Sequence, residues 1–524
     1  MDPGLLVALT LFLALLVGFF FLRRRSSYSC GDAAKQKRKL PLPPGPVAVP
    51  VLGNLLWLRR SLRDVEPLLR ELHARYGPVV SLRVGSRLLI FVSDRDLAHR
   101  ALVARGAAFA DRPAPLPTAR IFSADGHNIT SAPYGPLWRL LRRNLVAETL
   151  HPSRLVLFAP ARSWVLRLLL SKLRADAEGG GSVAVMGRLQ FAMFALLVLM
   201  CFGAKLDEEA VEEIGDAQRS LLLYDLNIFA FAPWITKRLF RKRWETAMEM
   251  RGRQKRIYVP LIEARRGGRG APESEGSFAH AYVDTLLGLT LPDEGGRALT
   301  DDEMVVLCSE FLNAGTDTTS TALEWIMAEL VRNPRVQDRL RAEIEQVVGA
   351  RGGDDGAAHE REVREEELQR MPYLKAVVLE GLRRHSPAHF VLPHAAAEED
   401  AELGGYAIPK HASLNFMVGE MGLDGAAWEA PMEFRPERFL EGGEGADVDV
   451  TGSREIKMMP FGAGRRICAG INVAMLHLEY FVANMVREFQ WTKVDGDDVD
   501  LTEKSQFTVV MKHPLRARLV PTTN

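Results

Sequence analysis

The residue with the most distinctive chemistry is Cys468, in the segment Phe461–Gly470 with the pattern Phe-x-x-Gly-x-Arg-x-Cys-x-Gly. Glycines let the backbone come close to a large flat ligand, because they carry no side chain and tolerate positive φ. A helix-like apolar run follows, and the positive end of a helix favours a thiolate. Thiolate is a proximal ligand of haem iron and favours O–O cleavage. A lone cysteine in a turn is ordinarily inert, but the complete pattern favours a haem ligand.

A second candidate for chemistry lies inside a long helical pattern at residues 301–332, whose centre reads Ala314-Gly315-Thr316-Asp317-Thr318-Thr319. Glycine and successive threonines are poor residues for a helix interior, and threonine hydroxyls can bond to carbonyls one turn earlier. We expect a distorted helix with a local groove, where Asp317 and Thr318 deliver protons to a reaction. The alternative is a kinked core helix without chemistry.

Two further pairs have a suggestive spacing. Glu380 and Arg383 are three residues apart, so they share a helix face and can form an ion pair, although such pairs on a surface are common and weak. Trp138 and Arg142 are one turn apart and suit an anionic planar ligand, because arginine binds carboxylates and the indole offers an N–H and a flat face. Neither pair is specific by itself.

The elements that must position these residues are mainly helical. Residues 79–84 and 88–92 alternate around Gly85 and predict a β-hairpin, whereas most of the remaining chain has helical periodicity. Composition is ordinary for a globular protein, with 47% hydrophobic and 25% charged residues. We therefore expect a mainly α fold with small β-sheets, in a single large domain over residues 47–524.

The N-terminus has the composition of a membrane anchor. Residues 5–22 are apolar and uncharged, are about long enough to span a bilayer, and are followed by three arginines. A cleaved signal peptide has the opposite order, and basic residues after the span keep the rest of the chain cytoplasmic. We assign residues 1–22 to a single-pass anchor and residues 23–46 to a basic, proline-rich linker that is stiff at residues 41–46. Its basic residues can contact anionic lipid headgroups, and the alternative is a solvated linker.

Charge and cysteine usage exclude several other classes. The formal net charge of +1 gives no case for binding nucleic acid. The four cysteines are far apart and show neither a disulfide framework nor zinc-ligand spacing. No Gly-x-Gly-x-x-Gly pattern follows a strand, so electrons for a redox reaction must come from another protein.

In their order and spacing, these motifs together with Pro436–Phe439 resemble the cytochrome P450 monooxygenases over essentially the whole chain. Residues 311–319 are similar to microsomal plant members. The resemblance implies a P450-type domain that holds haem b with Cys468 as the proximal ligand and Phe461 packed beside the sulfur. It further implies propionate ligands at Trp138, Arg142, Arg466 and His394, and a buried network of Glu380, Arg383 and Arg438. One turn departs from the family, with Leu423-Asp424-Gly425 where many relatives have Arg-Asp-Pro.

The resemblance also implies an activity. The enzyme would activate O2 with electrons from an NADPH-cytochrome P450 reductase at the endoplasmic reticulum membrane, and hydroxylate or epoxidise a small lipophilic substrate. One alternative is a haem-thiolate isomerase or dehydratase acting on a peroxide, which has no need of Asp317 and Thr318. Another is a membrane-tethered haem sensor or carrier. Residues that could line the substrate pocket, or could equally be core, are Phe122, Phe229, Phe231, Asn313, Ala314, Phe390, Val391 and Phe507.

Overall fold

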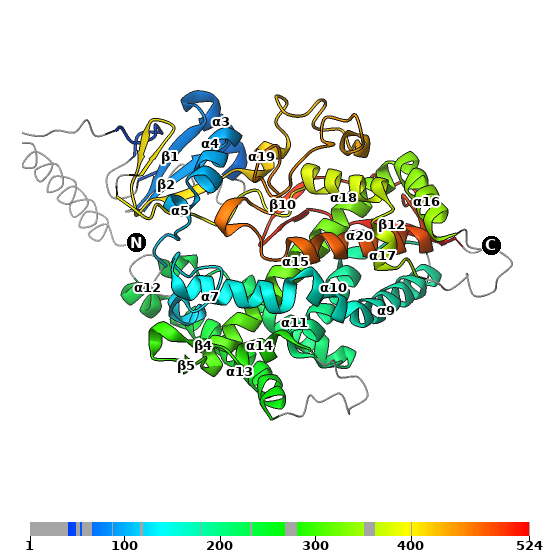
Figure 1. The fold of residues 1–524 in the computed structure, drawn as a ribbon, viewed down its shortest axis with the longest axis horizontal. Coiled ribbons are helices and arrows are strands. Elements are labelled where there is room, and N and C mark those ends of the chain that lie inside the picture. The colour runs from blue at the N-terminus through cyan, green and yellow to red at the C-terminus, as the bar shows by residue number, and fades with distance from the viewer. Residues whose placement is uncertain are drawn as a thin grey trace, which may run out of the picture.

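Helices dominate the structure, and the strands of the described residues form five small sheets (Figure 1). The computed structural model describes residues 40–48, 53–54, 65–85, 87–115, 119–179, 181–230, 233–267, 280–349, 362–399 and 401–522. This arrangement confirms the predicted fold class, mainly α with small β-sheets. The predicted anchor at residues 1–22 and most of the predicted linker lie outside the described residues.

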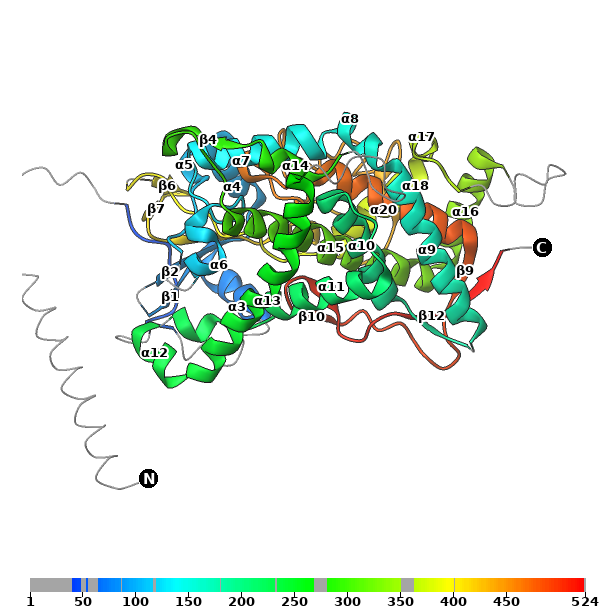
Figure 2. The same cartoon turned by 90° about the horizontal axis from the view of Figure 1, so that it is seen from below.

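The central element is α15 (Asp301–Arg332), which packs against both α10 (Val185–Phe202) and α20 (Ile471–Glu488) and lies in the middle of the helical part of the molecule (Figures 1 and 2). Its first turn is fixed by a capping box, in which the Thr300 side chain accepts from the amide of Glu303 and the Glu303 carboxylate accepts from the amide of Thr300. The predicted helical pattern over residues 301–332 coincides with α15, which is continuous through residues 314–319. Packing on several sides of the helix overrides the poor local propensity.

The other helices surround α15 or cover the sheets. The longer ones are α3 (Val65–Tyr76), α7 (Pro136–Leu145), α9 (Ala159–Glu178), α11 (Glu208–Leu222), α13 (Arg241–Arg266), α16 (Pro334–Val348) and α18 (Pro372–Arg384). The shorter ones are α4 (Arg95–His99), α5 (Gly106–Phe109), α6 (Ala119–Phe122), α8 (Pro152–Leu155), α12 (Pro233–Leu239), α14 (Tyr282–Leu287), α17 (Glu365–Leu368) and α19 (Val418–Gly422).

Within the described part of the chain, α10 is the one helix long and apolar enough to cross a membrane, with a mean hydropathy of 2.0. However, 72% of this helix is buried inside the protein, where it packs against α9 and α15. A helix that is apolar all round is typical of a protein core as well as of a membrane span. We therefore assign α10 to the core.

One of the two three-stranded sheets contains the predicted hairpin. Strands β1 (Val79–Val84) and β2 (Arg87–Val92) pair antiparallel, and Gly85 in their turn has a left-handed φ of 58°. Strand β8 (Ser413–Phe416) pairs in parallel with β2, so segments far apart in the sequence share one sheet. The other sheets are β3-β12-β9 (Val183–Ala184, Arg516–Pro521, Phe489–Thr492), β10-β11 (Glu503–Ser505, Val509–Met511), β4-β5 (Thr290–Leu291, Arg297–Ala298) and β6-β7 (Ala401–Leu403, Tyr406–Ile408).

Part of the proline-rich segment is packed onto these sheets. The carbonyl of Pro43 accepts from the Ser81 hydroxyl at 2.7 Å, and that of Pro44 accepts from the Ser81 amide at 2.7 Å. The carbonyl of Pro41 accepts from the amide of Ala407. These residues of the predicted stiff linker therefore contact the folded body.

Candidate functional site

The loop that carries Cys468 is held rigidly before α20. The amide of Cys468 donates to the carbonyl of Phe461 at 2.8 Å and closes the loop. Gly464 has a φ of 70°, and a Cβ at this position would lie 1.8 Å from the carbonyl oxygen of Leu102. Only glycine fits such a close approach of two backbones, so the spacing of glycines in the motif has a packing reason.

The thiol of Cys468 combines exposed surface with dense protein surroundings. The residue is exposed, yet protein atoms around the sulfur desolvate it and raise the pKa of the thiol. The Gly470 amide, which donates to the sulfur at 3.3 Å, and the charge of Arg142 lower that pKa in part. In the protein without a bound metal, the effect of burial on the pKa of Cys468 is therefore larger than the predicted bias toward thiolate. A metal ion bound to the sulfur deprotonates a thiol outright.

Two predicted anion-binding arginines lie beside the same loop. Arg142 donates to the carbonyl of Ile467 at 2.5 Å, and Arg466 donates to the carbonyls of Ala110 and Ala132 at 2.8 and 2.7 Å. Both guanidinium groups lie over the ring of Trp138, at 5.6 and 4.4 Å from its centroid. Burial lowers the pKa of both arginines, that of Arg466 to about 9, with the nearby charge of Arg112 contributing to the shift at Arg466.

Arg112 is a third member of this cluster that the sequence motifs do not reveal. It donates to the carbonyls of Thr130, Leu392 and Pro393 at 2.8–3.0 Å, and burial lowers its pKa to about 10. Its partners are distant in the sequence, and an arginine between Asp111 and Pro113 has no diagnostic spacing. Within the described ranges, no carboxylate lies at ion-pair distance from Arg112, Arg142 or Arg466.

Two buried ring nitrogens in this region lack a hydrogen-bond partner among the described residues, the indole Nε1 of Trp138 and Nδ1 of His394. Burial lowers the pKa of His394 to about 3, and the charges of Arg112 and Arg466 add to this shift while the Leu392 carbonyl opposes it, so the ring is neutral. Arginines without a carboxylate partner, the unpartnered indole N–H and a cysteine thiol are what a planar ligand with two carboxylates and a metal requires. The residues present therefore fit haem.

The predicted acid and hydroxyl lie on α15, which packs against α20. Ala314 is exposed in the middle of this largely buried helix, and the Thr318 hydroxyl donates to the Ala314 carbonyl at 2.6 Å. Asp317 is buried and forms an ion pair with Arg219 of α11 at 3.1 Å. Burial raises the pKa of Asp317, while Arg219 lowers it. The sequence gives no signal for Arg219, because the contact joins two separate helices.

The predicted network around Glu380 is fully buried, which excludes the alternative of a surface pair. Glu380 accepts from Arg383 at 2.7 and 2.8 Å and from Arg438 at 3.0 Å, and the side chains of all three are 0% exposed. Both guanidinium groups lie near the face of Trp428, at 5.3 and 5.9 Å. The turn that departs from the family pattern precedes Trp428, whose amide donates to the Asp424 carbonyl. The departure therefore leaves the packing of Trp428 intact.

The candidates for a substrate pocket have different environments. Phe229 is fully buried and packs edge-to-face on Trp244, which favours a core role, whereas Phe507 is 46% exposed. Phe390 packs on Phe91. Phe231 lies outside the described residues.

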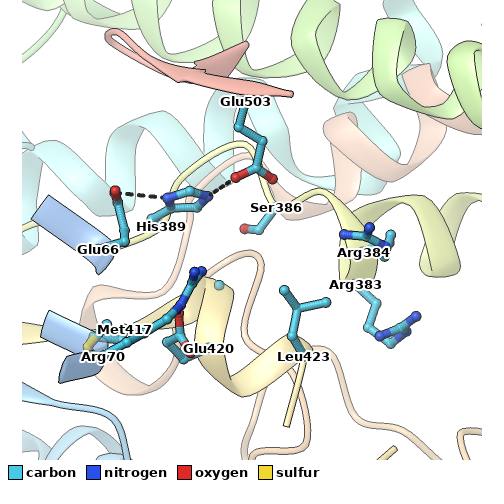
Figure 3. Close-up of a pocket in the computed structure, with 11 residues that line it drawn as sticks. Glu66, Arg70, Arg383, Arg384, Ser386, His389, Met417, Glu420, Leu423 and Glu503 are labelled. Carbon is cyan, nitrogen blue, oxygen red and sulfur yellow. Dashed lines mark hydrogen bonds and ion pairs between the residues drawn. The ribbon is translucent and has the colours of Figure 1, made fainter. Parts of the chain in front are cut away.

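An ionic clamp, defined as Glu66, His389 and Glu503, fixes the loop that carries Phe390. Figure 3 shows His389 between the two carboxylates, with Nδ1 at 2.9 Å from Glu66 of α3 and Nε2 at 3.1 Å from Glu503 of β10. Burial lowers the pKa of His389, but the two carboxylates outweigh it and raise this pKa to about 9. The ring is therefore a cation at neutral pH. No sequence motif marks this residue, since its partners come from opposite ends of the chain.

Comparisons with known proteins agree with this geometry. The model of the family described as Cytochrome P450 matches residues 43–520. The chain is 47% identical to Cytochrome P450 89A9 of Arabidopsis thaliana, over 92% of this chain and 94% of that protein. It is 31% identical to a flavonoid 3'-monooxygenase of Crocosmia x crocosmiiflora, over 98% and 97%. A zebra fish cytochrome P450 solved with progesterone matches the fold with a TM-score of 0.70 at 23% identity, over 87% of this chain and 99% of that one.

Proposed function

Because this chain belongs to the cytochrome P450 family and is a haem-thiolate monooxygenase, we propose that Cys468 provides the thiolate and that the enzyme oxidises a small lipophilic substrate with electrons from NADPH-cytochrome P450 reductase. The reaction places one atom of O2 in the substrate by hydroxylation or epoxidation. The observation that supports this proposal most is the meeting of the Cys468 loop with three arginines that have no carboxylate partner in the described ranges. These groups match a metal and two carboxylates on one planar ligand.

The bound haem supplies the redox and O2 chemistry, which protein side chains cannot provide. The sulfur of Cys468 would hold the iron, and Phe461 would shield this side of the site. Arg142, Arg466 and Arg112 would neutralise the two propionates. The indole N–H of Trp138, and His394 in the tautomer with its proton on Nδ1, would donate to the same carboxylates, which removes the cost of leaving these atoms unsatisfied.

Asp317 and Thr318 handle protons in the proposed reaction. The buried carboxyl group of Asp317 has a raised pKa and can hold a proton, while Arg219 limits this shift and keeps the group able to release it. The hydroxyl of Thr318 lies one turn of α15 after exposed Ala314, on the same face of the helix, and can donate there once it leaves the Ala314 carbonyl. This pair favours monooxygenation over the isomerase alternative, which has no use for a proton supply.

We further propose that residues 1–22 anchor the chain in the endoplasmic reticulum membrane in a single pass, and that the catalytic domain, residues 47–524, lies on the cytoplasmic side. The apolar run followed by three arginines supports this topology. The arrangement places the domain beside a reductase on the same membrane and close to lipophilic substrates dissolved in the bilayer.

The test uses the full chain with haem, together with the reductase. Small lipophilic molecules are first screened for spectral shifts on binding, and turnover of those that bind is then followed with isotopically heavy O2. We expect product formation to require NADPH and reductase, and the product to carry one heavy oxygen. Turnover of a peroxide without NADPH and reductase would instead support the isomerase, and binding without any turnover would support a sensor or carrier.

A further inference from the structure

The segment between α6 and α7 contains the most strained backbone in the described part of the chain. Ala124, Asp125 and Gly126 are successive residues with positive φ of 45°, 55° and 91°. Two of them carry a Cβ, which disfavours this conformation. Strain of this kind persists only where the surroundings fix the backbone, and it is often found near functional sites. The contacts of the residues that follow, 127–132, which we term the strap, supply this restraint.

One edge of the strap is bonded to α15 through a single side chain. The two carboxylate oxygens of Glu310 accept from the amides of Ile129 and Thr130 at 2.8 and 2.5 Å. Burial raises the pKa of Glu310, while these hydrogen bonds and Arg112 lower it. Hydrogen bonds from amides to a carboxylate are stronger than those between neutral groups. Glu310 lies one helical turn before Ala314, so the strap crosses α15 beside the exposed face described above.

The opposite edge of the strap is bonded to the arginines of the haem site. The carbonyls of Ile129 and Ala132 accept from Arg466 at 3.3 and 2.7 Å, and that of Thr130 accepts from Arg112 at 2.8 Å. The strap therefore lies between α15 and the guanidinium groups next to the Cys468 loop. Any ligand that approaches the exposed part of α15 from this side meets the strap first.

The beginning of the strap is held by a second, separate contact. Nε2 of His127 lies 2.8 Å from Glu294 and 3.4 Å from Glu303, which is in the first turn of α15. Arg297 binds the same two carboxylates. The start of the strap is thus fixed independently of Glu310, so loss of the Glu310 contacts alone releases the edge of the strap at residues 129–130 that faces α15. The beginning of the strap and its bonds to Arg112 and Arg466 stay in place.

We propose that Glu310 is a positioning residue that latches the strap against α15 and thereby restricts the access of bulky ligands to the haem site. This inference rests on the proposed function, because it assumes that haem lies beside Cys468 and Arg466. Glu310 itself does not touch the reacting atoms. Glu310 holds two main-chain amides, and through them the edge of the strap that faces α15.

The first measurement is amide hydrogen exchange of the haem-loaded full chain, in the wild type and in Glu310→Gln. We expect the amides of Ile129 and Thr130 to exchange about tenfold faster or more in the variant, since the charged acceptor is lost. Glu343→Gln is the matched control, because Glu343 also accepts two amides, those of Tyr373 and Leu374, at 2.8 Å each. That control should loosen residues 373–374 and leave residues 129–130 unchanged.

The second measurement compares the association rates of imidazole and 4-phenylimidazole, two haem ligands that differ in bulk. In Glu310→Gln the rate for 4-phenylimidazole should rise several-fold while that for imidazole changes little, and in Glu343→Gln neither should change. Glu310→Asp keeps the charge, but its side chain is one methylene group shorter, so we expect an intermediate association rate for 4-phenylimidazole. This variant replaces Glu310→Gln in the test if Glu310→Gln does not fold.

The outcomes separate the two proposals. Unchanged exchange at residues 129–130 overturns the latch, and faster exchange with an unchanged ratio of association rates overturns its role in access. A wild-type protein that binds haem without the spectral signature of a thiolate ligand overturns the proposed function instead, whatever the exchange rates are.

Discussion

Replacing Glu380 by Gln tests the buried network most sharply. The change keeps the shape of the side chain but removes the negative charge that faces both Arg383 and Arg438. Arg438 retains Glu444, whereas Arg383 keeps only main-chain carbonyls, among them those of Gly422 and Pro431 at 2.8 and 2.9 Å. The variant therefore leaves one fully buried cation without a counter-ion.

The expected cost follows from this geometry. Breaking a buried ion pair by removing one partner destabilises a protein by about 3–5 kcal/mol. An unfolding entropy of about 2.1 cal/mol/K per residue, over a domain of about 480 residues, converts this into a fall in Tm of only about 3–5 °C. Large proteins often unfold irreversibly, so the unfolding rate is the better observable. If the network breaks before the transition state, the rate rises about a hundredfold or more.

The assay is unfolding in urea followed by tryptophan fluorescence, because Trp428 lies over both arginines. Glu245→Gln is the control, since Glu245 pairs with Arg241 at 2.6 Å on the surface, where the two side chains are 55% and 80% exposed. We expect an effect of at most about 0.5 kcal/mol there. If Glu380→Gln unfolds no faster than this control, the argument that the buried charge holds the region together is wrong.

Three further results are expected. Thr318→Ala should release more peroxide per NADPH consumed, whereas Thr318→Ser, which keeps the hydroxyl, should not. The same amount of peroxide per NADPH in both variants would mean that the protons come from another group. His389→Gln should lower the free energy of unfolding by up to about 3 kcal/mol below pH 6.5, because the pKa of His389 is raised to about 9. In urea titrations, the difference in this free energy between variant and wild type should vanish as the pH rises through 9. A difference that persisted at pH 10 would mean that packing, and not the charge, is responsible. Deleting residues 1–22 should lower the membrane-bound fraction of the protein, and an unchanged fraction on sedimentation would show that other surfaces bind the membrane.

The sequence was sufficient for features that depend on local spacing. The hairpin around Gly85 follows from period-two alternation. The Trp138–Arg142 and Arg466–Cys468 motifs are each visible in a short stretch of chain, but that the two stretches meet was implied by the family resemblance. Helical periodicity over residues 301–332 predicts α15 with the bounds it has, and packing against neighbouring helices keeps its centre helical where local propensity is poor.

Contacts between distant segments could not be predicted in the same way. Arg219 meets Asp317 from another helix, and Arg112 binds carbonyls almost 300 residues away, as the separations of 280 and 281 show. His389 binds Glu66 and Glu503, which lie in α3 and β10. None of these residues has a spacing that distinguishes it from an ordinary charged side chain, so only the fold reveals them.

The central claim is that the sulfur of Cys468 is the axial ligand of a bound haem. The most direct test is the absorption spectrum of the reduced carbon monoxide complex of the full chain, in the wild type and in Cys468→Ser. We expect the wild type to show the thiolate signature and the variant to lose it, because a serine hydroxyl does not donate electron density to the iron as a thiolate does. An unchanged signature in Cys468→Ser would contradict the assignment of the ligand.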